Sequence, residues 1–362
     1  MLALTSRALL ALAIALAVLA VVAVGVLVSR SGAAGRPLGR RVALTTVPVV
    51  ALVLLAQTAA VTAVGLAVNN SYGFYTSWSD LFGGPAGNTP ITTGGLVTAT
   101  QGAVRVFTVH AHTGGADDRV LVWTPPQYDQ AVRAGHRLPV VMFLPGQPSS
   151  PVGTFRHFDF AAIASRLIDS GKVPPFVAVI PTLMIAPPRD TECTDVPGGP
   201  QAASWLEKDV PAFVTRHYQV QPLGPGWTAM GWSTGGFCAA KMLTTHPANF
   251  SSAVSFGGYY RPLQDGTTGS LFAGNPSLEQ HNSPTWLYLN DVRHGGLHGA
   301  RLLLVAGKQD KETWPQTAAM INLTDGDPAV SHISFPAGGH NYRNYRNYLP
   351  AALTWSASGW PR

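Results

Sequence analysis

A serine with a glycine two residues away on each side is the feature of this sequence with the clearest chemical meaning. Ser233 lies in Gly-Trp-Ser-Thr-Gly-Gly at residues 231–236, after the apolar residues 227–230 and before a helix-like segment at residues 237–243. A strand, a tight turn and a helix in this order form the nucleophile elbow of the G-x-S-x-G pattern. Larger residues in place of the glycines would collide with the adjoining strand or helix. We therefore predict that Ser233 is a nucleophile rather than part of an ordinary Gly-rich turn.

A serine hydroxyl needs a general base, and the base needs a carboxylate that orients it. In the α/β-hydrolase arrangement the acid and then the histidine follow the serine, each in a loop after a strand. Asp310 comes just beyond the apolar residues 302–305, and His340 lies in a Gly-rich loop after the last apolar run. Glu312 is the alternative acid, because a loop can present either side chain. Asp291 precedes the strand and fits less well.

An oxyanion hole should combine the Thr234 N–H, at the start of the elbow helix, with a second N–H from the loop after an early strand. Residues 140–144 are apolar and end at Pro145 and Gly146. Proline has no N–H to donate, so the backbone of Gln147 is the better second donor. An ordinary turn is the alternative interpretation of this loop.

Strands and helices alternate after residue 103, as expected for a mostly parallel sheet covered by helices. Short β-branched runs predict strands at residues 104–109, 120–123, 140–144, 176–180, 228–232, 253–256, 302–305 and 332–335. Helix-like segments lie at residues 160–169, 203–217, 235–245, 313–321 and 342–354. The sequence therefore predicts one α/β-hydrolase catalytic domain over residues 103–362.

The first 69 residues form a separate, strongly apolar region. They contain no Asp or Glu, and their charged residues are Arg7, Arg30, Arg36, Arg40 and Arg41. Apolar stretches at residues 8–28 and 42–68 are each long enough to cross a hydrocarbon core of about 30 Å as a helix. A cleaved signal peptide is the alternative for residues 1–28, but its core is usually only about 7–15 residues long. We expect a membrane anchor of two transmembrane helices at residues 1–69 and a linker at residues 70–102.

The distribution of charged residues predicts the orientation of the chain in the membrane and argues against nucleic acid as a partner. Four of the five arginines lie between the two apolar stretches, and only Arg7 precedes the first. The positive-inside rule therefore puts the short loop in the cytoplasm and the catalytic domain outside it, at the cell membrane. Five of the 24 Lys and Arg residues belong to the anchor, which leaves 19 against 18 acidic residues. Such a balance gives no reason to expect nucleic-acid binding.

Cys193 and Cys238 are the only cysteines. Two thiols cannot build a structural zinc site by themselves, and an exported domain favours a disulfide between them, with two separate buried thiols as the alternative. The bond would pin the loop around Cys193 beside the elbow helix. Asp190, Glu192 and Asp195 in that loop could suggest a metal site, but no histidine accompanies them. We therefore expect a solvated loop and no metal.

Several motifs resemble those of the putative esterase family. They are Val-Trp-Thr-Pro-Pro-Gln-Tyr at residues 122–128, Phe-Leu-Pro-Gly at 143–146, Leu-Glu-Lys-Asp-Val-Pro at 206–211, Gly-Trp-Ser-Thr-Gly-Gly at 231–236 and Gly-Gly-His at 338–340. That family includes esterase D-type enzymes, ferulic-acid esterases and the mycobacterial antigen 85 mycolyltransferases. The resemblance covers about residues 100–358. It implies carboxylic-ester chemistry without a metal or organic cofactor, with catalytic roles for Ser233, Asp310 and His340.

Two departures separate this sequence from the antigen 85 proteins. Their acid is a glutamate, where this loop offers Asp310 first, and they are secreted behind a cleaved signal instead of being held by two helices. We expect a serine esterase that hydrolyses an ester or acyl-lipid at the outer membrane surface. An acyltransferase that moves the acyl group to an envelope sugar or lipid hydroxyl is the alternative. A non-catalytic surface protein on the same fold is the third hypothesis.

Overall fold

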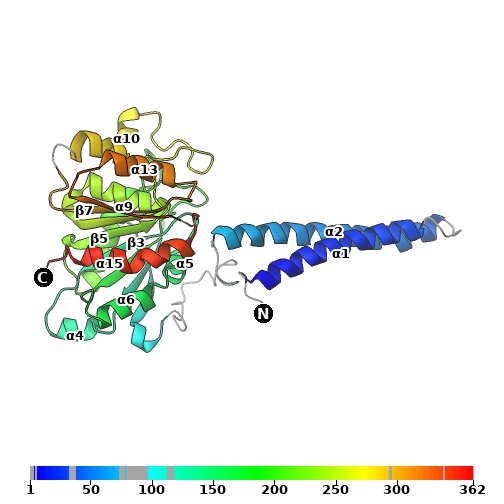
Figure 1. Ribbon diagram of the computed structural model, residues 1–362, viewed down its shortest axis with the longest axis horizontal. Helices are drawn as coiled ribbons and strands as arrows, with labels where there is room; N and C mark the ends of the chain where they lie inside the picture. Colours follow the sequence, from blue (N-terminus) through cyan, green and yellow to red (C-terminus); the bar gives the residue numbers. More distant parts are fainter. Residues whose placement is uncertain are drawn as a thin grey trace. The chain divides into compact units, whose positions relative to one another are not determined.

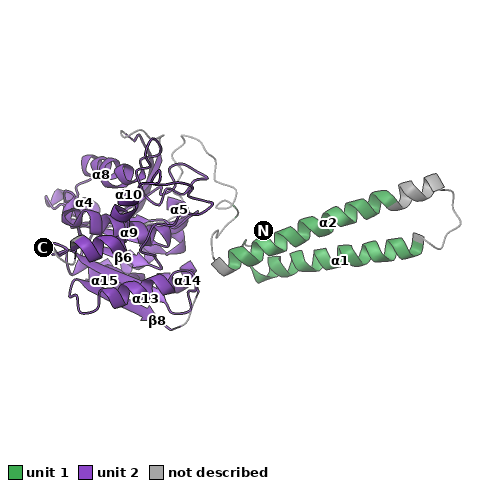
Figure 2. Cartoon of the chain, turned by 90° about the horizontal axis from the view of Figure 1, so that it is seen from above, with its two compact units in different colours: residues 1–86 green, residues 87–362 purple. Residues whose placement is uncertain are grey.

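The computed structural model describes residues 4, 6–31, 38–72, 78, 97–111, 118–292, 296–336 and 339–361. The chain divides into two compact units, residues 1–86 and residues 87–362 (Figure 2). Most of the linker expected at residues 70–102 lies outside the described residues. Of its C-terminal part, the structure describes a short 3-10 turn, Ala99–Gln101, which leads into the first strand.

Two long helices make up the first unit. Helices α1 (Arg7–Ser31) and α2 (Leu38–Tyr72) pack along each other (Figure 1). Their segments Arg7–Arg30 and Thr46–Asn70 have mean hydropathies of 3.1 and 2.2, and only 11% of each apolar window is buried. A pair of helices that exposes most of its apolar surface matches the composition of membrane-spanning helices. Both are therefore candidate spans.

Polar residues in the second apolar stretch are accommodated within the helix itself. The Thr58 hydroxyl donates to the Leu54 carbonyl at 2.8 Å, and the Thr62 hydroxyl donates to the Thr58 carbonyl at 2.7 Å. Since each hydroxyl is satisfied one turn back, it needs no water. These threonines are therefore compatible with a hydrocarbon surrounding.

The second unit is built on an eight-stranded sheet with the order β1-β2-β4-β3-β5-β6-β7-β8. Strands β1 and β2 are antiparallel to each other, and β2 is antiparallel to β4, whereas all other neighbours are parallel. The strands are β1 (Ala103–Val109), β2 (Asp118–Thr124), β3 (Val140–Leu144), β4 (Val177–Pro181), β5 (Gly224–Trp232), β6 (Phe250–Phe256), β7 (Arg301–Gly307) and β8 (Val330–Phe335). All eight predicted strands and the mostly parallel sheet are confirmed.

Helices cover both faces of this sheet (Figure 1). The main ones are α5 (Pro151–His157), α6 (Phe160–Asp169), α8 (Val210–His217), α9 (Thr234–Thr245), α13 (Trp314–Leu323) and α15 (Leu349–Ala357). Alternate residues of the buried strands enter different cores: Val140 and Met142 pack with α8 and α9, while Val141 and Phe143 pack with α6 and α15. This period of two explains why β3 is apolar throughout.

Two predicted helices are interrupted in the structure. The segment predicted at residues 203–217 is α7 (Ala202–Ser204), a π-helical turn η2 (Trp205–Asp209) and α8. The segment predicted at residues 342–354 is α14 (Tyr342–Tyr345), a 3-10 turn η5 (Arg346–Tyr348) and α15. Pro211 and Pro350 lie at the starts of α8 and α15, and a proline cannot donate the backbone hydrogen bond that would continue the preceding turn.

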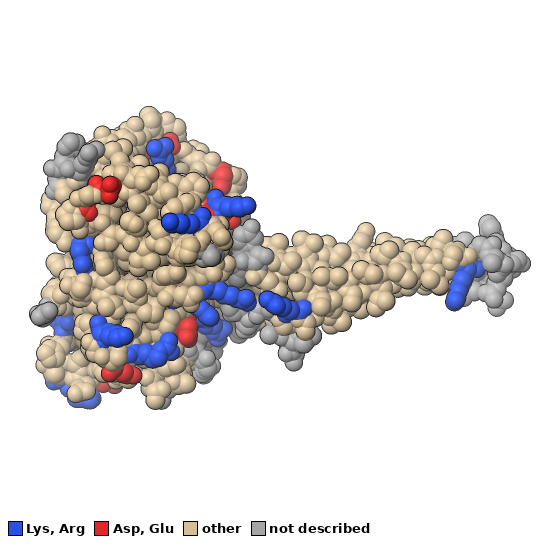
Figure 3. Space-filling view, in the orientation of Figure 1, with Lys and Arg blue, Asp and Glu red and all other residues tan. Residues whose placement is uncertain are grey.

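The charged side chains of the second unit are dispersed. Figure 3 shows Lys and Arg intermixed with Asp and Glu on the visible face of this unit. A surface with both signs interspersed provides no large field of one sign. That distribution agrees with the near neutrality of the domain.

A disulfide joins the predicted pair of cysteines. Cys193 and Cys238 are bonded, with their Cα atoms 5.9 Å apart and a sequence separation of 45. The bond links the long loop after β4 to the first turns of α9. The disulfide prediction is confirmed, and the alternative of two separate thiols is wrong.

Candidate active site

Ser233 occupies the turn between β5 and α9 in a strained backbone conformation. Its φ is 56° and its ψ is −121°. Positive φ is costly for a residue with a Cβ and persists only where the surroundings enforce it. The Ser233 N–H donates to the Phe256 carbonyl at the end of β6, at 2.9 Å. This backbone bond between neighbouring strands fixes the turn that carries the serine.

The glycines on either side of the turn let neighbouring backbone segments come closer together than any larger residue would permit. A Cβ on Gly231 would lie 2.0 Å from the Gly235 carbonyl oxygen. A Cβ on Gly235 would lie 2.2 Å from the Leu144 carbonyl oxygen at the end of β3. Both distances are far inside van der Waals contact. The elbow geometry inferred from the sequence pattern is therefore present, and its steric reason is visible.

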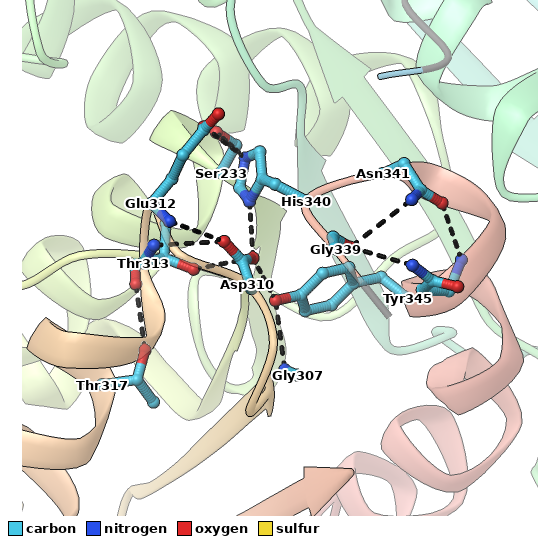
Figure 4. A network of polar contacts seen from close by, with 12 residues as sticks. Ser233, Gly307, Asp310, Glu312, Thr313, Thr317, Gly339, His340, Asn341 and Tyr345 are labelled. Carbon is cyan, nitrogen blue, oxygen red and sulfur yellow. Dashed lines mark hydrogen bonds and ion pairs between the residues drawn. The ribbon is translucent and has the colours of Figure 1, made fainter. Parts of the chain in front are cut away.

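A chain of hydrogen bonds joins three of the predicted site residues (Figure 4). His340 Nε2 lies 2.9 Å from Ser233 Oγ, and His340 Nδ1 lies 2.7 Å from Asp310 Oδ2. Since an ionised carboxylate can only accept, Nδ1 carries the proton, and Nε2 is left to accept from the serine hydroxyl. The three residues come from loops after β5, β7 and β8, which end at the same edge of the sheet.

Asp310 is completely buried and held by several donors besides the histidine. Its Oδ2 accepts from the Tyr345 hydroxyl at 2.6 Å and from the Thr313 hydroxyl at 2.9 Å. Burial alone would raise the pKa of this carboxyl, but the hydrogen bond and charge of His340, with the Tyr345 hydroxyl, outweigh it and lower the pKa to about 2. Asp310 is therefore ionised at neutral pH. Thr313 and Tyr345 were not singled out from the sequence.

Glu312 lies on the other side of the imidazole ring. Its Oε2 is 3.9 Å from His340 Nε2, and its side chain is 55% exposed. Because Asp310 already bonds Nδ1, Glu312 is not placed to orient the ring from that side. The side chain of Asp291 lies outside the described residues.

The two predicted oxyanion donors belong to segments that border Ser233. Thr234 is the first residue of α9. In the loop after β3, a Cβ on Gly146 would lie 3.0 Å from the Ser233 Cβ and 2.6 Å from the Trp232 ring. The absence of a side chain at Gly146 thus lets the segment that carries Gln147 lie directly against the serine. Donation by the Thr234 and Gln147 amides stays a prediction.

The loop that the sequence analysis expected to be solvated is buried, so that prediction is wrong. Asp190 and Glu192 are only 3% and 1% exposed. The loop wraps around Lys241 of α9, whose ammonium donates to the carbonyls of Glu192 and Cys193 at 3.1 and 2.6 Å. Within the described residues, no group of three or more His, Cys, Asp or Glu side chains could hold a metal ion.

Glu192 connects this buried loop to the elbow. The Tyr259 hydroxyl donates to Glu192 Oε1 at 2.5 Å and lies 3.3 Å from the Thr234 hydroxyl oxygen. Burial and the neighbouring Asp190 charge raise the pKa of Glu192 to about 8, although the Tyr259 hydrogen bond opposes them. Burial also lowers the pKa of Lys241, to about 8. The residue that follows the predicted nucleophile is therefore in contact with a titratable, water-excluded network.

The raised pKa of Glu192 predicts how stability depends on pH. Its pKa in the folded protein, about 8, exceeds the ordinary value of 4.5, so folding favours the protonated acid. This stabilisation is complete below pH 4.5 and is lost as the pH rises to 8. Glu192→Gln cannot ionise. The difference in free energy of unfolding, variant minus wild type, should therefore increase by up to about 1.4 kcal/mol per pH unit between pH 5 and pH 8.

Urea unfolding of both proteins at several pH values in this window measures the difference. Lys241 has a folded pKa of about 8 against an ordinary 10.5, so it is charged in both states over most of the window and contributes little slope. Glu279→Gln, an exposed change on helix α10 (Pro276–His281), is the matched control and should show no pH-dependent difference. A gap between Glu192→Gln and wild type that stays constant with pH would contradict the prediction.

The sequence matches one known protein family over most of the second unit. Residues 112–356 match the family model described as putative esterase. The chain is also 27% identical over 254 residues to an uncharacterised protein of Corynebacterium glutamicum. That match covers 68% of this chain but only 58% of the relative, so a large part of the relative has no counterpart in the alignment.

Solved structures share the fold at low sequence identity. A ferulic acid esterase superposes with a TM-score of 0.62 at 16% identity, over 72% of this chain and 100% of that one. An S-formylglutathione hydrolase from Agrobacterium tumefaciens gives 0.61 at 18%, over 73% and 98% of the two chains. A fluorophosphonate-binding serine hydrolase of Staphylococcus aureus gives 0.60 at 18%, over 71% and 98%. With this fold and the family match, the chain belongs to the putative esterase family of α/β-hydrolases.

Proposed function

We propose that the protein is a serine-dependent carboxylic ester hydrolase that works through an acyl-enzyme on Ser233. The observation that carries the proposal is the continuous hydrogen-bond chain from Ser233 through His340 to a buried, ionised Asp310. A hydroxyl, a base and an orienting acid in this arrangement make up the minimum machinery for acyl transfer to serine. The match to the putative esterase family supports the same reaction class, acyl transfer through a serine.

The geometry suggests the order of the proton transfers. As Ser233 Oγ attacks the ester carbonyl carbon, its proton moves to His340 Nε2, and the resulting imidazolium is stabilised by Asp310 at Nδ1. Nε2 then gives the proton to the alkoxy oxygen as the carbon–oxygen bond of the ester breaks. In the second half, water attacks the acyl-enzyme, its proton moves to Nε2, and Ser233 leaves as the hydroxyl. No metal or organic cofactor takes part in this sequence.

For the oxyanion we propose the backbone N–H groups of Thr234 and Gln147. The N–H of Thr234 is at the start of α9, where the helix dipole favours negative charge. Gln147 follows Gly146, which packs against Ser233. Two donors directed at the developing charge would stabilise the tetrahedral intermediate more than the neutral ester.

We further propose that α1 and α2 anchor the enzyme in the cell membrane with the catalytic unit on the extracytoplasmic side. The support comes from two candidate spans and from four arginines between them. The disulfide agrees with an oxidising compartment. An anchored site would meet esters and acyl-lipids of the envelope at high local concentration.

Ser233→Ala tests the nucleophile. A fluorophosphonate probe should label the wild-type serine covalently, because an activated hydroxyl attacks phosphorus as it attacks an acyl carbon. Mass spectrometry of the labelled peptide should find the adduct on Ser233 alone, and Ser233→Ala should lose it while keeping its circular dichroism spectrum. Labelling that persists in the folded variant would reject the assignment, and no labelling of wild type would favour a non-catalytic surface protein.

Asp310→Asn and Glu312→Gln test the acid. Loss of the buried carboxylate should lower kcat by about 10³- to 10⁴-fold, because the imidazole loses its orientation and its counter-charge. Glu312 faces Nε2, so its isosteric amide should have a much smaller effect on kcat. Steady-state hydrolysis of p-nitrophenyl acetate by the two variants provides the comparison. The reverse ranking would transfer the role to Glu312.

Product partition separates hydrolysis from acyl transfer. With p-nitrophenyl esters and added trehalose, most of the acyl group should appear as free acid, because water is in large excess over the added sugar. Liquid chromatography of the products measures the ratio. Capture of most of the acyl group by the sugar would replace the hydrolase proposal with a mycolyltransferase-like acyltransferase.

Reporter fusions test the orientation. A phosphatase that is active only after export should be active when fused after residue 70, and a reporter that needs the cytoplasm should be inactive there. Fusions within the arginine-containing loop should give the opposite pattern. An inverted result at both positions would place the catalytic unit in the cytoplasm.

A further inference from the structure

The Glu312 carboxylate lies beside His340 Nε2, the atom that accepts and donates the protons in the proposed reaction. Its Oε2 is 3.9 Å from His340 Nε2, the same nitrogen that lies 2.9 Å from Ser233 Oγ. In Figure 4 Ser233 and the Glu312 carboxylate both lie at the Nε2 edge of the ring, opposite Asp310. The Glu312 carboxylate therefore lies next to the position that the leaving and entering groups must occupy.

This carboxylate is not used to hold the protein together. The Glu312 backbone N–H donates to Asp310 Oδ1 at 3.1 Å, which fixes the loop. The side chain itself is 55% exposed, and among the described residues no donor lies within hydrogen-bond distance of its oxygens. Asp310, two residues earlier, is by contrast fully buried and accepts from five donors. Glu312 thus presents unused acceptor capacity to the site.

The chemistry of the acylation step defines what must approach it. Ser233 Oγ forms a bond to the acyl carbon, the carbon–oxygen bond to the alcohol breaks, and Nε2 delivers the serine proton to the departing oxygen. That oxygen must therefore come within hydrogen-bond distance of Nε2. Substituents on the next carbon atoms of the alcohol then lie within reach of Glu312, which itself exchanges no proton and forms no covalent bond.

We propose that Glu312 is a specificity-determining residue that selects the alcohol part of the ester. It accepts a hydrogen bond from a hydroxyl, or pairs with a cationic group, close to the scissile oxygen, and it repels an anionic group there. The inference rests on the proposed esterase function and narrows its substrates to esters of polyols such as sugars or glycerol, or of cationic alcohols. Esters whose alcohol part carries a carboxylate near the scissile bond are disfavoured.

A set of acetate esters that differ in the alcohol alone tests this selection. The alcohols are ethylene glycol, with a neutral hydroxyl; propanol, in which a methyl replaces that hydroxyl; choline, with a cation; and glycolate, with an anion. The wild-type protein should cleave the ethylene glycol and choline esters with a kcat/KM about tenfold or more above those of the propanol and glycolate esters, respectively. A charge-assisted hydrogen bond and one close charge pair are each strong enough for such a ratio.

Two variants separate the charge of Glu312 from its hydrogen bond. Glu312→Gln keeps an acceptor oxygen, so it should abolish most of the discrimination between choline and glycolate while retaining part of the preference for ethylene glycol over propanol. Glu312→Ala should lose both preferences. Glu279→Gln removes an exposed charge on α10 and should leave all four ratios as in wild type. Ratios that are the same in wild type, Glu312→Gln and Glu312→Ala would overturn the inference.

Failure of the inference and failure of the proposed function give different results. If the proposed esterase function is wrong, wild type cleaves none of the four esters and its Ser233 is not labelled by a fluorophosphonate. If only the role of Glu312 is wrong, wild type is labelled and cleaves the esters, but its ratios do not respond to residue 312. Labelling of both Glu312 variants at the wild-type extent establishes that they are folded and that Ser233 is still reactive.

Discussion

The left-handed backbone of Ser233 is the constraint on which the catalytic unit depends. A residue with a side chain adopts a φ of 56° only when its neighbours leave it no alternative. Here the constraint comes from three directions: the chain enters from a buried strand, leaves directly into α9, and donates to the Phe256 carbonyl of the next strand. Gly231 and Gly235 make the resulting backbone contacts possible. The strain is thus compensated by the packing of the sheet and the helix that it joins.

Fixing α9 is therefore as important as fixing the serine. The helix is held by the loop after β4, through the Cys193–Cys238 disulfide and through Lys241, whose ammonium donates to loop carbonyls. In addition, Tyr259 links Glu192 of the same loop to Thr234. A buried lysine and a buried glutamic acid are costly to desolvate, and a network of satisfied hydrogen bonds offsets much of that cost. The loop after β4 thereby connects the elbow to the disulfide and to the buried hydrogen-bond network of Glu192 and Lys241.

The sequence predicted those parts of the structure that local pattern determines. The strands were predicted from their β-branched runs. Ser233, Asp310 and His340 were proposed from their places after strands, and the sheet brings these three residues together at one edge. What it missed depends on contacts distant in sequence. Tyr345 contacts Asp310 from 35 residues away in the sequence. The burial of the loop around Glu192 could not be predicted, because Lys241, around which the loop closes, is 49 residues away. A polar loop that closes over a charged side chain has the same composition as one that faces water.

The two carboxylates of the loop after β7 differ in role because they differ in burial and in hydrogen-bond partners, not because of their residue type. Asp310 and Glu312 are two residues apart and both approach His340, but from opposite edges of the ring. Asp310 is buried and accepts from Tyr345, Thr313 and His340. Burial alone would raise its pKa, but the hydrogen bond and charge of His340, with the Tyr345 hydroxyl, lower the pKa to about 2. Glu312 stays open to solvent, where screening weakens its effect on the histidine but leaves it free to meet a substrate. In the mechanism that we propose, the shorter side chain orients the base because it is buried, and the longer one faces the alcohol part of the ester.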